Sequence, residues 1–69
     1  PEAKEGELAL LLVRLYRSLD ALVGNDEARR LAWMRSPNDA LGGVPATLIL
    51  SAQGLVAAVS YLDAMRAPV

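Results

Sequence analysis

The sequence predicts an all-α fold: a small bundle of three main helices plus one short helix. Three observations favour this class. Apolar residues recur at helical spacing near both ends of the chain, as they do on one face of an amphipathic helix. Most of them are Leu, Ala and Val, aromatic residues make up 4% of the chain, and Phe is absent. The one strand candidate, residues 47–50, follows too closely on Pro45 to favour a strand.

The first helix is predicted over residues 8–23. Its core face is expected to centre on Leu15, because at 100° per residue several leucines fall within about 60° of it. These are Leu8, Leu11, Leu12, Leu19 and Leu22. Acidic residues near the start suit the positive end of the helix dipole. Gly24 is expected to end the helix, because glycine adopts a positive φ without a Cβ penalty.

A second helix is predicted from an N-cap at Asn25 or Asp26 to about Arg35. Trp33 is expected to anchor the core rather than to stack on a nucleic-acid base, since no basic aromatic surface surrounds it. The neighbouring Arg29–Arg30 pair is expected to form a solvated helix face, with contact to a partner as the alternative.

The connection that follows is predicted to interrupt the helical pattern. Pro37 disfavours the α conformation in Ser36, so the second helix should stop there. Asn38 is expected to cap a brief turn through Leu41, which Gly42–Gly43 then ends.

Two further helices complete the predicted bundle. Pro45 suits the first position of a short helix that reaches about Leu50. Ser51 is expected to cap a last helix over residues 52–67, with Pro68 beyond its end. The core stripe of this helix is predicted to be Leu55, Ala58, Val59 and Leu62.

The composition excludes most catalytic and metal-binding classes. With 69 residues the chain forms one small domain. The absence of cysteine excludes a disulfide framework, a thiolate zinc site and a cysteine nucleophile, and the absence of histidine removes the commonest general base and transition-metal ligand. No two carboxylates have a spacing that supports acid–base chemistry. We therefore expect a binding or assembly module that is not an enzyme and needs no metal or cofactor.

Charge and hydropathy narrow the class of partner. Seven Lys and Arg against eight Asp and Glu argue against an affinity that depends on neutralising phosphates. The longest apolar run, Leu8–Val13, is too short to cross a membrane, and the N-terminus is acidic where a signal peptide is basic. A membrane-surface helix is disfavoured because the polar face of the first helix carries only Arg14 and Arg17. We expect a cytoplasmic protein without a membrane partner.

Hydrophobic residues make up 54% of the chain, more than one small core covers. Leu10 and Val13 lie among the polar residues of the first helix, away from its core face and near Arg17. They are either isolated surface apolars, which are common, or part of an oligomer seam or of a contact with an upstream domain. We expect a seam formed by Leu10, Val13 and Arg17, and therefore a homo-oligomer.

The core stripe of the last helix leads to Arg66 when it is continued by one turn. A charged residue on this line indicates that the helix has left the core, so residues 65–69 are expected to project from the domain. The alternative is a frayed helix end, at which Arg66 complements the helix dipole and pairs with Asp63.

A series of helix-end and turn residues occurs in an order that resembles a known family. The series is Gly24, Asp26, Glu27, Trp33, Met34, Pro37, Asn38, Leu41, Gly42, Gly43, Pro45 and Gly54, closed by residues 61–65. From about Leu8 to Arg66 the chain resembles the C-terminal toxin-binding domain of the MbcA/ParS/Xre antitoxin family. The block from Trp33 to Pro45 is the most specific part, because it combines a helix end, a capped turn, a Gly–Gly break and a helix restart in fixed order.

This resemblance implies an antitoxin of a type II toxin–antitoxin system. It would neutralise a RES-domain toxin, which consumes NAD+, by covering the toxin's active site with its C-terminal helix and tail. Arg66 would reach a cleft built for a pyrophosphate. Carried over residue by residue, the implied toxin-binding set is Tyr61, Leu62, Met65, Arg66, Ala67, Pro68 and Val69. The implied structural set is Gly24, Trp33, Pro37, Asn38, Leu41, Gly43, Pro45 and Gly54.

The chain departs from the family pattern at both ends. Family members commonly carry an upstream helix-turn-helix domain that binds their own promoter, and residues 1–7 are too short for one. We interpret residues 1–7 as an N-terminal extension, with the truncated end of an upstream region as the alternative, and residues 8–69 as the toxin-binding domain. Many relatives also continue after the closing Met-Arg with Gly and a basic residue, where this chain has Ala67–Pro68.

An alternative function belongs to a different class. The chain could be the dimerisation or assembly domain of a helix-turn-helix transcription regulator whose DNA-binding part is absent here. DNA is expected as a partner only if such an upstream domain exists outside this chain.

Overall fold

The computed structural model describes residues 2–66, with side chains from Lys4 onward. In this part of the chain the secondary structure is all-α: α1 (Glu2–Val23), α2 (Glu27–Arg35), α3 (Pro45–Leu48) and α4 (Ala52–Arg66). The predicted three main helices and one short helix are therefore confirmed. The strand candidate at residues 47–50 lies in α3 and the turn after it, as the proline just upstream predicted.

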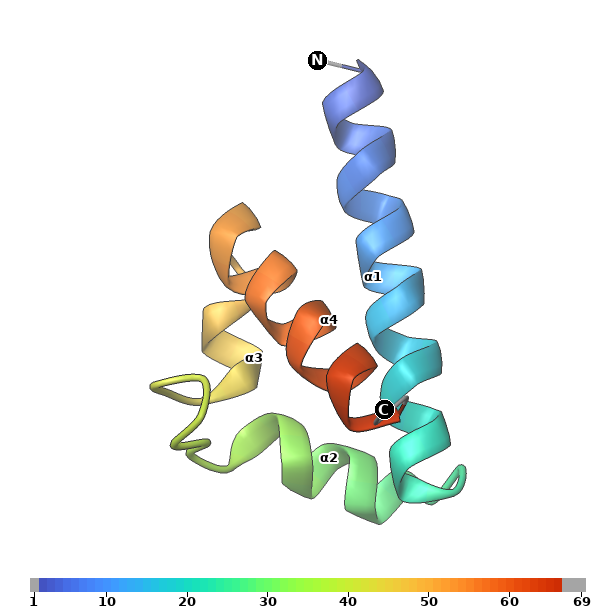
Figure 1. Ribbon diagram of the computed structural model, residues 1–69, viewed down its shortest axis with the longest axis vertical. Coiled ribbons are helices and arrows are strands. Elements are labelled where there is room, and N and C mark those ends of the chain that lie inside the picture. Colours follow the sequence, from blue (N-terminus) through green and yellow to red (C-terminus); the bar gives the residue numbers. More distant parts are fainter. Residues whose placement is uncertain (1, 67–69) are drawn as a thin grey trace.

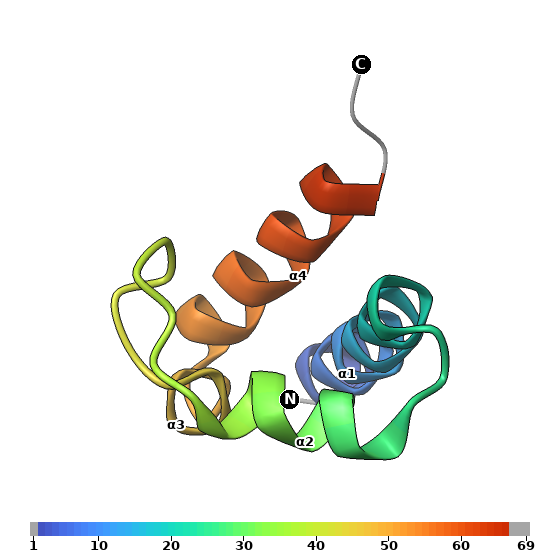
Figure 2. The ribbon, with the colours of Figure 1, turned by 90° about the horizontal axis from the view of Figure 1, so that it is seen from below.

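Two helices form the body of the molecule. α1 and α4 lie side by side, α2 crosses below them, and α3 connects the loop after α2 to the start of α4 (Figure 1). Seen from below, α2 spans the distance between α3 and the end of α1 (Figure 2). The first turns of α1 extend beyond α4 (Figure 1).

The predicted start of the first helix at Leu8 is wrong. α1 begins at Glu2 and runs without a break through residue 8. Acidic residues in the opening turns stabilise it there, because they lie at the positive end of the helix dipole. No structural boundary separates residues 2–7 from the remainder of α1.

The core is built almost entirely by α1 and α4. Its buried side chains are Leu15, Leu19 and Val23 from α1 and Leu55, Ala58, Val59 and Leu62 from α4. The stripe predicted for the last helix is confirmed. Half-buried side chains from α2 and the loops close the core from below, among them Trp33, Met34, Leu41 and Ile49.

The core face predicted for α1 is correct at its centre and wrong at two positions. Leu12 is 46% exposed and Leu22 is 38% exposed. Leu12 lies on the α2 side of the helix, where it lines an open groove. Ser18 is the α1 residue to which the last turn of α4 makes hydrogen bonds, and Leu22 lies one turn beyond it.

The expected caps and turns are confirmed residue by residue. Gly24 ends α1 with φ +67°, and the Asp26 side chain accepts a hydrogen bond from the Arg29 amide at 3.1 Å. The Asn38 side chain accepts one from the Leu41 amide at 3.1 Å, and the turn closes through Gly42 at φ +80°. These local contacts satisfy the backbone donors that a helix start or a tight turn leaves unpaired.

The junction between α3 and α4 requires a residue without a side chain at position 54. The Ser51 hydroxyl accepts a hydrogen bond from the Gly54 amide at 2.9 Å, which confirms the predicted N-cap. A Cβ atom on Gly54 would lie 1.9 Å from the Leu48 carbonyl oxygen, a distance that no relaxation of a side chain relieves. Glycine at this position therefore sets how closely α4 approaches α3.

We predict that Gly54→Ala destabilises the domain by about 1–3 kcal/mol or more, because the new methyl group overlaps backbone atoms. Gly6→Ala is the matched control: it lies in exposed α1 with nothing within 4 Å of an added Cβ. That change should stabilise the domain by about 0.5–1 kcal/mol, since alanine favours a helix interior. Urea denaturation of both variants measures the difference, and equal stabilities would contradict the close approach at Gly54.

Candidate functional site

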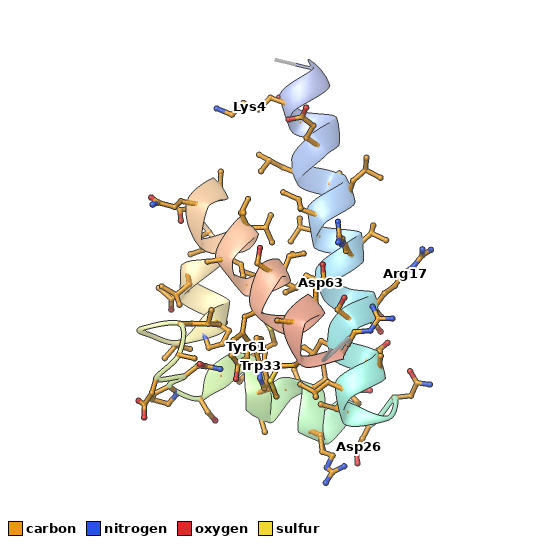
Figure 3. All side chains as sticks on the ribbon, in the orientation of Figure 1. Lys4, Arg17, Asp26, Trp33, Tyr61 and Asp63 are labelled. Carbon is orange, nitrogen blue, oxygen red and sulfur yellow. The ribbon has the colours of Figure 1, made fainter. Side chains whose placement is uncertain are left out.

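The last turn of α4 is joined to α1 through a buried hydroxyl group. Ser18 is fully buried, and its Oγ donates a hydrogen bond to Asp63 Oδ1 at 3.0 Å. The same Oγ accepts one from Arg66 Nη1 at 3.1 Å. The second oxygen of Asp63 accepts from Arg14 on α1, and Figure 3 shows Asp63 facing that helix. We refer to Arg14, Ser18, Asp63 and Arg66 as the Ser18 network.

The Ser18 network corrects the expectations for Arg66. The pair between Arg66 and Asp63, which belonged to the alternative of a frayed helix end, is not formed, because the carboxylate of Asp63 bonds to Ser18 and Arg14 instead. Arg66 is exposed, as expected for a residue that has left the core, yet its guanidinium is held against α1 and does not project freely.

The residues implied as toxin-binding separate into two groups in the structure. Met65 is 50% exposed and Arg66 is also exposed, so both are accessible at the end of α4. Leu62 has no exposed surface in the unbound domain, because it continues the core stripe of α4, so the structure offers no surface of this side chain for the implied contact. Ala67, Pro68 and Val69 lie outside the described residues.

Tyr61 links α4 to α2. It is half-buried, and its ring stacks on Trp33 with 6.5 Å between the ring centroids and 25° between the planes (Figure 3). Trp33 packs against the core as predicted. Tyr61 therefore supports the position of α4 and keeps only part of its surface for a partner.

The residues of the predicted seam lie on an open side of α1. Leu10 is 71% exposed, Val13 is 47% exposed, and Arg17 extends away from α4 (Figure 3). A shallow hollow of about 330 Å³ lies beside them, lined by Glu7, Leu10, Leu11 and Arg14. That another copy of the chain covers this side stays a prediction.

A second apolar surface was not predicted from the sequence. A groove of about 390 Å³ opens between α1 and α2, and we call it the α1–α2 groove. It is lined by Leu12, Leu15, Tyr16, Leu19, Arg30, Leu31, Met34 and Ile49. These residues come from three parts of the chain, so no single stretch signals the groove. The pair Leu12 and Tyr16, four residues apart on one helix, is the local signal that could have indicated its edge.

Arg30 at this groove is not part of a solvated face as predicted. Its guanidinium donates to Asp20 and lies 4.8 Å from the centroid of the Tyr16 ring. The hydrogen bond to Asp20 raises the pKa of Arg30 above its usual value. Arg29 is exposed, as expected. The difference arises because Arg30 points toward α1, whereas Arg29 lies on the outer side of α2.

Membrane-spanning helices and clusters of metal ligands are both absent from the part of the chain that the structure describes. Among residues 2–66 no helix combines the length and apolar character needed to span a bilayer. The same residues contain no group of three or more potential metal-ligating side chains. An all-α body with apolar side chains exposed on two sides of one helix has the features of a protein-binding domain.

The chain belongs to a family of antitoxins. It matches the family model of the antitoxin Xre/MbcA/ParS C-terminal toxin-binding domain over residues 18–67, which is most of its length. A search among curated proteins gave no match. The matched range begins at Ser18 and contains α2, α3, α4 and every residue of the structural set from Gly24 to Gly54. By this description, the matched domain is the part of an antitoxin that binds a toxin.

We predict that Tyr61→Ala shifts the fluorescence emission of Trp33, the single tryptophan, to longer wavelength, because one face of the indole opens to water. The stacked pair also contributes about 0.5–1.5 kcal/mol to stability beyond its buried area. Tyr16→Ala is the control, since Tyr16 is an exposed tyrosine that does not stack on Trp33. Identical emission spectra for the two variants would show that Tyr61 does not cover the indole.

Proposed function

We propose that this domain neutralises an NAD+-consuming toxin of the RES class by covering its active site with the end of α4 and the tail that follows. The observation that carries the proposal is the match of residues 18–67 to a toxin-binding domain. It is supported by the exposure of Met65 and Arg66, which are the described residues of the implied contact set that are most open to a partner. The cytoplasm is the proposed location, because that is where the toxin would find its NAD+.

The proposed mechanism is steric and involves no reaction on the antitoxin. Met65 supplies apolar contact at the end of α4, and Arg66 supplies the planar donors that match a cleft built for a pyrophosphate. Ala67–Val69 extend the contact beyond the helix. Leu62 and Tyr61 act from behind, since the first fills the core and the second braces α4 against Trp33.

The proposal is tested by expressing the chain with the toxin encoded beside its gene and measuring cellular NAD+ and toxin affinity. We expect deletion of residues 66–69 to abolish protection, and Met65→Ala to weaken binding about tenfold or more, as at a buried hot spot. Leu50→Ala is the matched control: this leucine is 84% exposed in the turn before α4, far along the helix from Met65, and its loss should leave affinity nearly unchanged. Full protection by the deleted chain would rule out active-site covering.

We further propose that the domain self-associates through α1. An antiparallel pair of α1 helices centred between Leu10 and Val13 places Glu7 of each helix near Arg17 of the other copy. Such a symmetric interface covers the apolar residues and pairs opposite charges in one step. Self-association is also what the alternative function, an assembly domain of a helix-turn-helix regulator, requires.

Sedimentation equilibrium tests this seam. The unmodified chain should form dimers, and Leu10→Ser combined with Val13→Ser should give monomers, because the apolar area that drives association is removed. Leu12→Ser is the control, since Leu12 is a similarly exposed leucine on the groove side of α1 and should leave the dimer intact. A monomer at all concentrations of the unmodified chain would contradict the seam.

A further inference from the structure

We propose that Ser18 and Asp63 are positioning residues, which hold the guanidinium of Arg66 in the orientation in which it binds an anionic group in the toxin's cleft. This inference rests on the proposed function, because it takes the end of α4 as the contact surface. It adds two residues that do not touch the toxin and assigns them a role in how tightly the toxin is bound.

The direction of every hydrogen bond in the Ser18 network is fixed. An arginine only donates and a carboxylate only accepts, so Ser18 must accept from Arg66 and donate its single proton to Asp63. Donation to a carboxylate polarises the hydroxyl and makes its oxygen a better acceptor for the guanidinium. Because Ser18 is fully buried, its hydroxyl group is not accessible to water.

The charge balance of the network leaves Arg66 available to a partner. The second oxygen of Asp63 accepts a hydrogen bond from Arg14. The ion pairs among the described residues are Arg14–Asp63 and Arg30–Asp20. Within this part of the chain, therefore, no carboxylate neutralises Arg66 directly. One of its five donors bonds to Ser18, and the others remain for an anion.

Holding Arg66 in advance raises affinity because it reduces an entropic cost. A long side chain that is free in solution loses rotamer freedom when it is fixed in an interface. The bond to Ser18 has already removed part of this freedom in the unbound domain, since it ties the far end of the side chain to the core. An alanine at position 18 would fill nearly the same volume, so packing alone does not require the hydroxyl.

A double-mutant cycle on toxin affinity tests the inference. In the full chain, Ser18→Ala should weaken toxin binding about tenfold when Arg66 is present and at most about twofold in the Arg66→Ala background, as expected for coupled residues. Ser60→Ala, an exposed serine on α4, is the control and should change affinity in neither background. An equal loss in both backgrounds would make Ser18 merely structural and overturn the inference.

The carboxylate is tested by a graded pair of changes. Asp63→Asn keeps an oxygen that accepts from Ser18 and should lower affinity by no more than about threefold, whereas Asp63→Ala should lower it as much as Ser18→Ala does. If the two changes at Asp63 have the same effect, the hydrogen bond to Ser18 does not position Arg66.

A measurement without toxin separates failure of the inference from failure of the proposed function. In the isolated domain, NMR of the Arg66 guanidinium should report one preferred orientation. In the Ser18→Ala variant, the same signals should report an average over several orientations. If this averaging is seen and Arg66→Ala leaves toxin affinity unchanged, the proposed contact of Arg66 fails and the positioning role fails with it. If Arg66→Ala weakens binding but Ser18→Ala causes no averaging, only the positioning role is overturned.

Discussion

The packing of α4 along α1 is the contact on which the structure depends. In a chain of 69 residues there is room for one core, and seven buried apolar side chains from these two helices form it. α2 contributes no fully buried residue, and α3 is a single turn that brings α4 to its place. A change that separated α1 from α4 would therefore leave the other elements with nothing to cover.

The same contact determines which surfaces remain for other proteins. α4 covers one flank of α1 only, so Leu10 and Val13 stay exposed on the back and Leu12 at the α1–α2 groove. At the far end of the contact, Ser18 holds the last turn of α4 where Met65 and Arg66 reach the surface. A small core thus leaves apolar area for a partner and fixes the helix end proposed to meet it.

Much of the fold could be predicted because its signals are local. Caps at Asp26 and Ser51, the turn at Asn38 and the stop before Pro37 each depend on residues within a few positions of one another. The site could be predicted less well. The Ser18 network joins residues 45 to 49 positions apart, and nothing in the local pattern distinguishes a bond between Arg66 and Ser18 from one between Arg66 and Asp63.

The helical pattern also could not predict which individual leucines of α1 are buried. Leu12 and Leu22 share the core face of α1 by angle, but their burial depends on where neighbouring helices begin and end. The necessity of Gly54 became clear only from its distance to the Leu48 carbonyl, although its place in the motif had marked it as structural. The resemblance supplied the family, and the structure supplied a physical reason for several of its motif residues.

Photo-crosslinking from the two methionines of this sequence distinguishes the possible docking surfaces most directly. Met65 lies at the end of α4 and Met34 lines the α1–α2 groove, so a photo-reactive methionine analogue reports on both places in one experiment. In the complex with the toxin, we expect crosslinks from Met65 to the peptides that form the toxin's NAD+ cleft, and none from Met34 to the toxin. Crosslinks to the toxin from Met34 alone, or from Met65 to a surface remote from that cleft, would contradict active-site covering by α4.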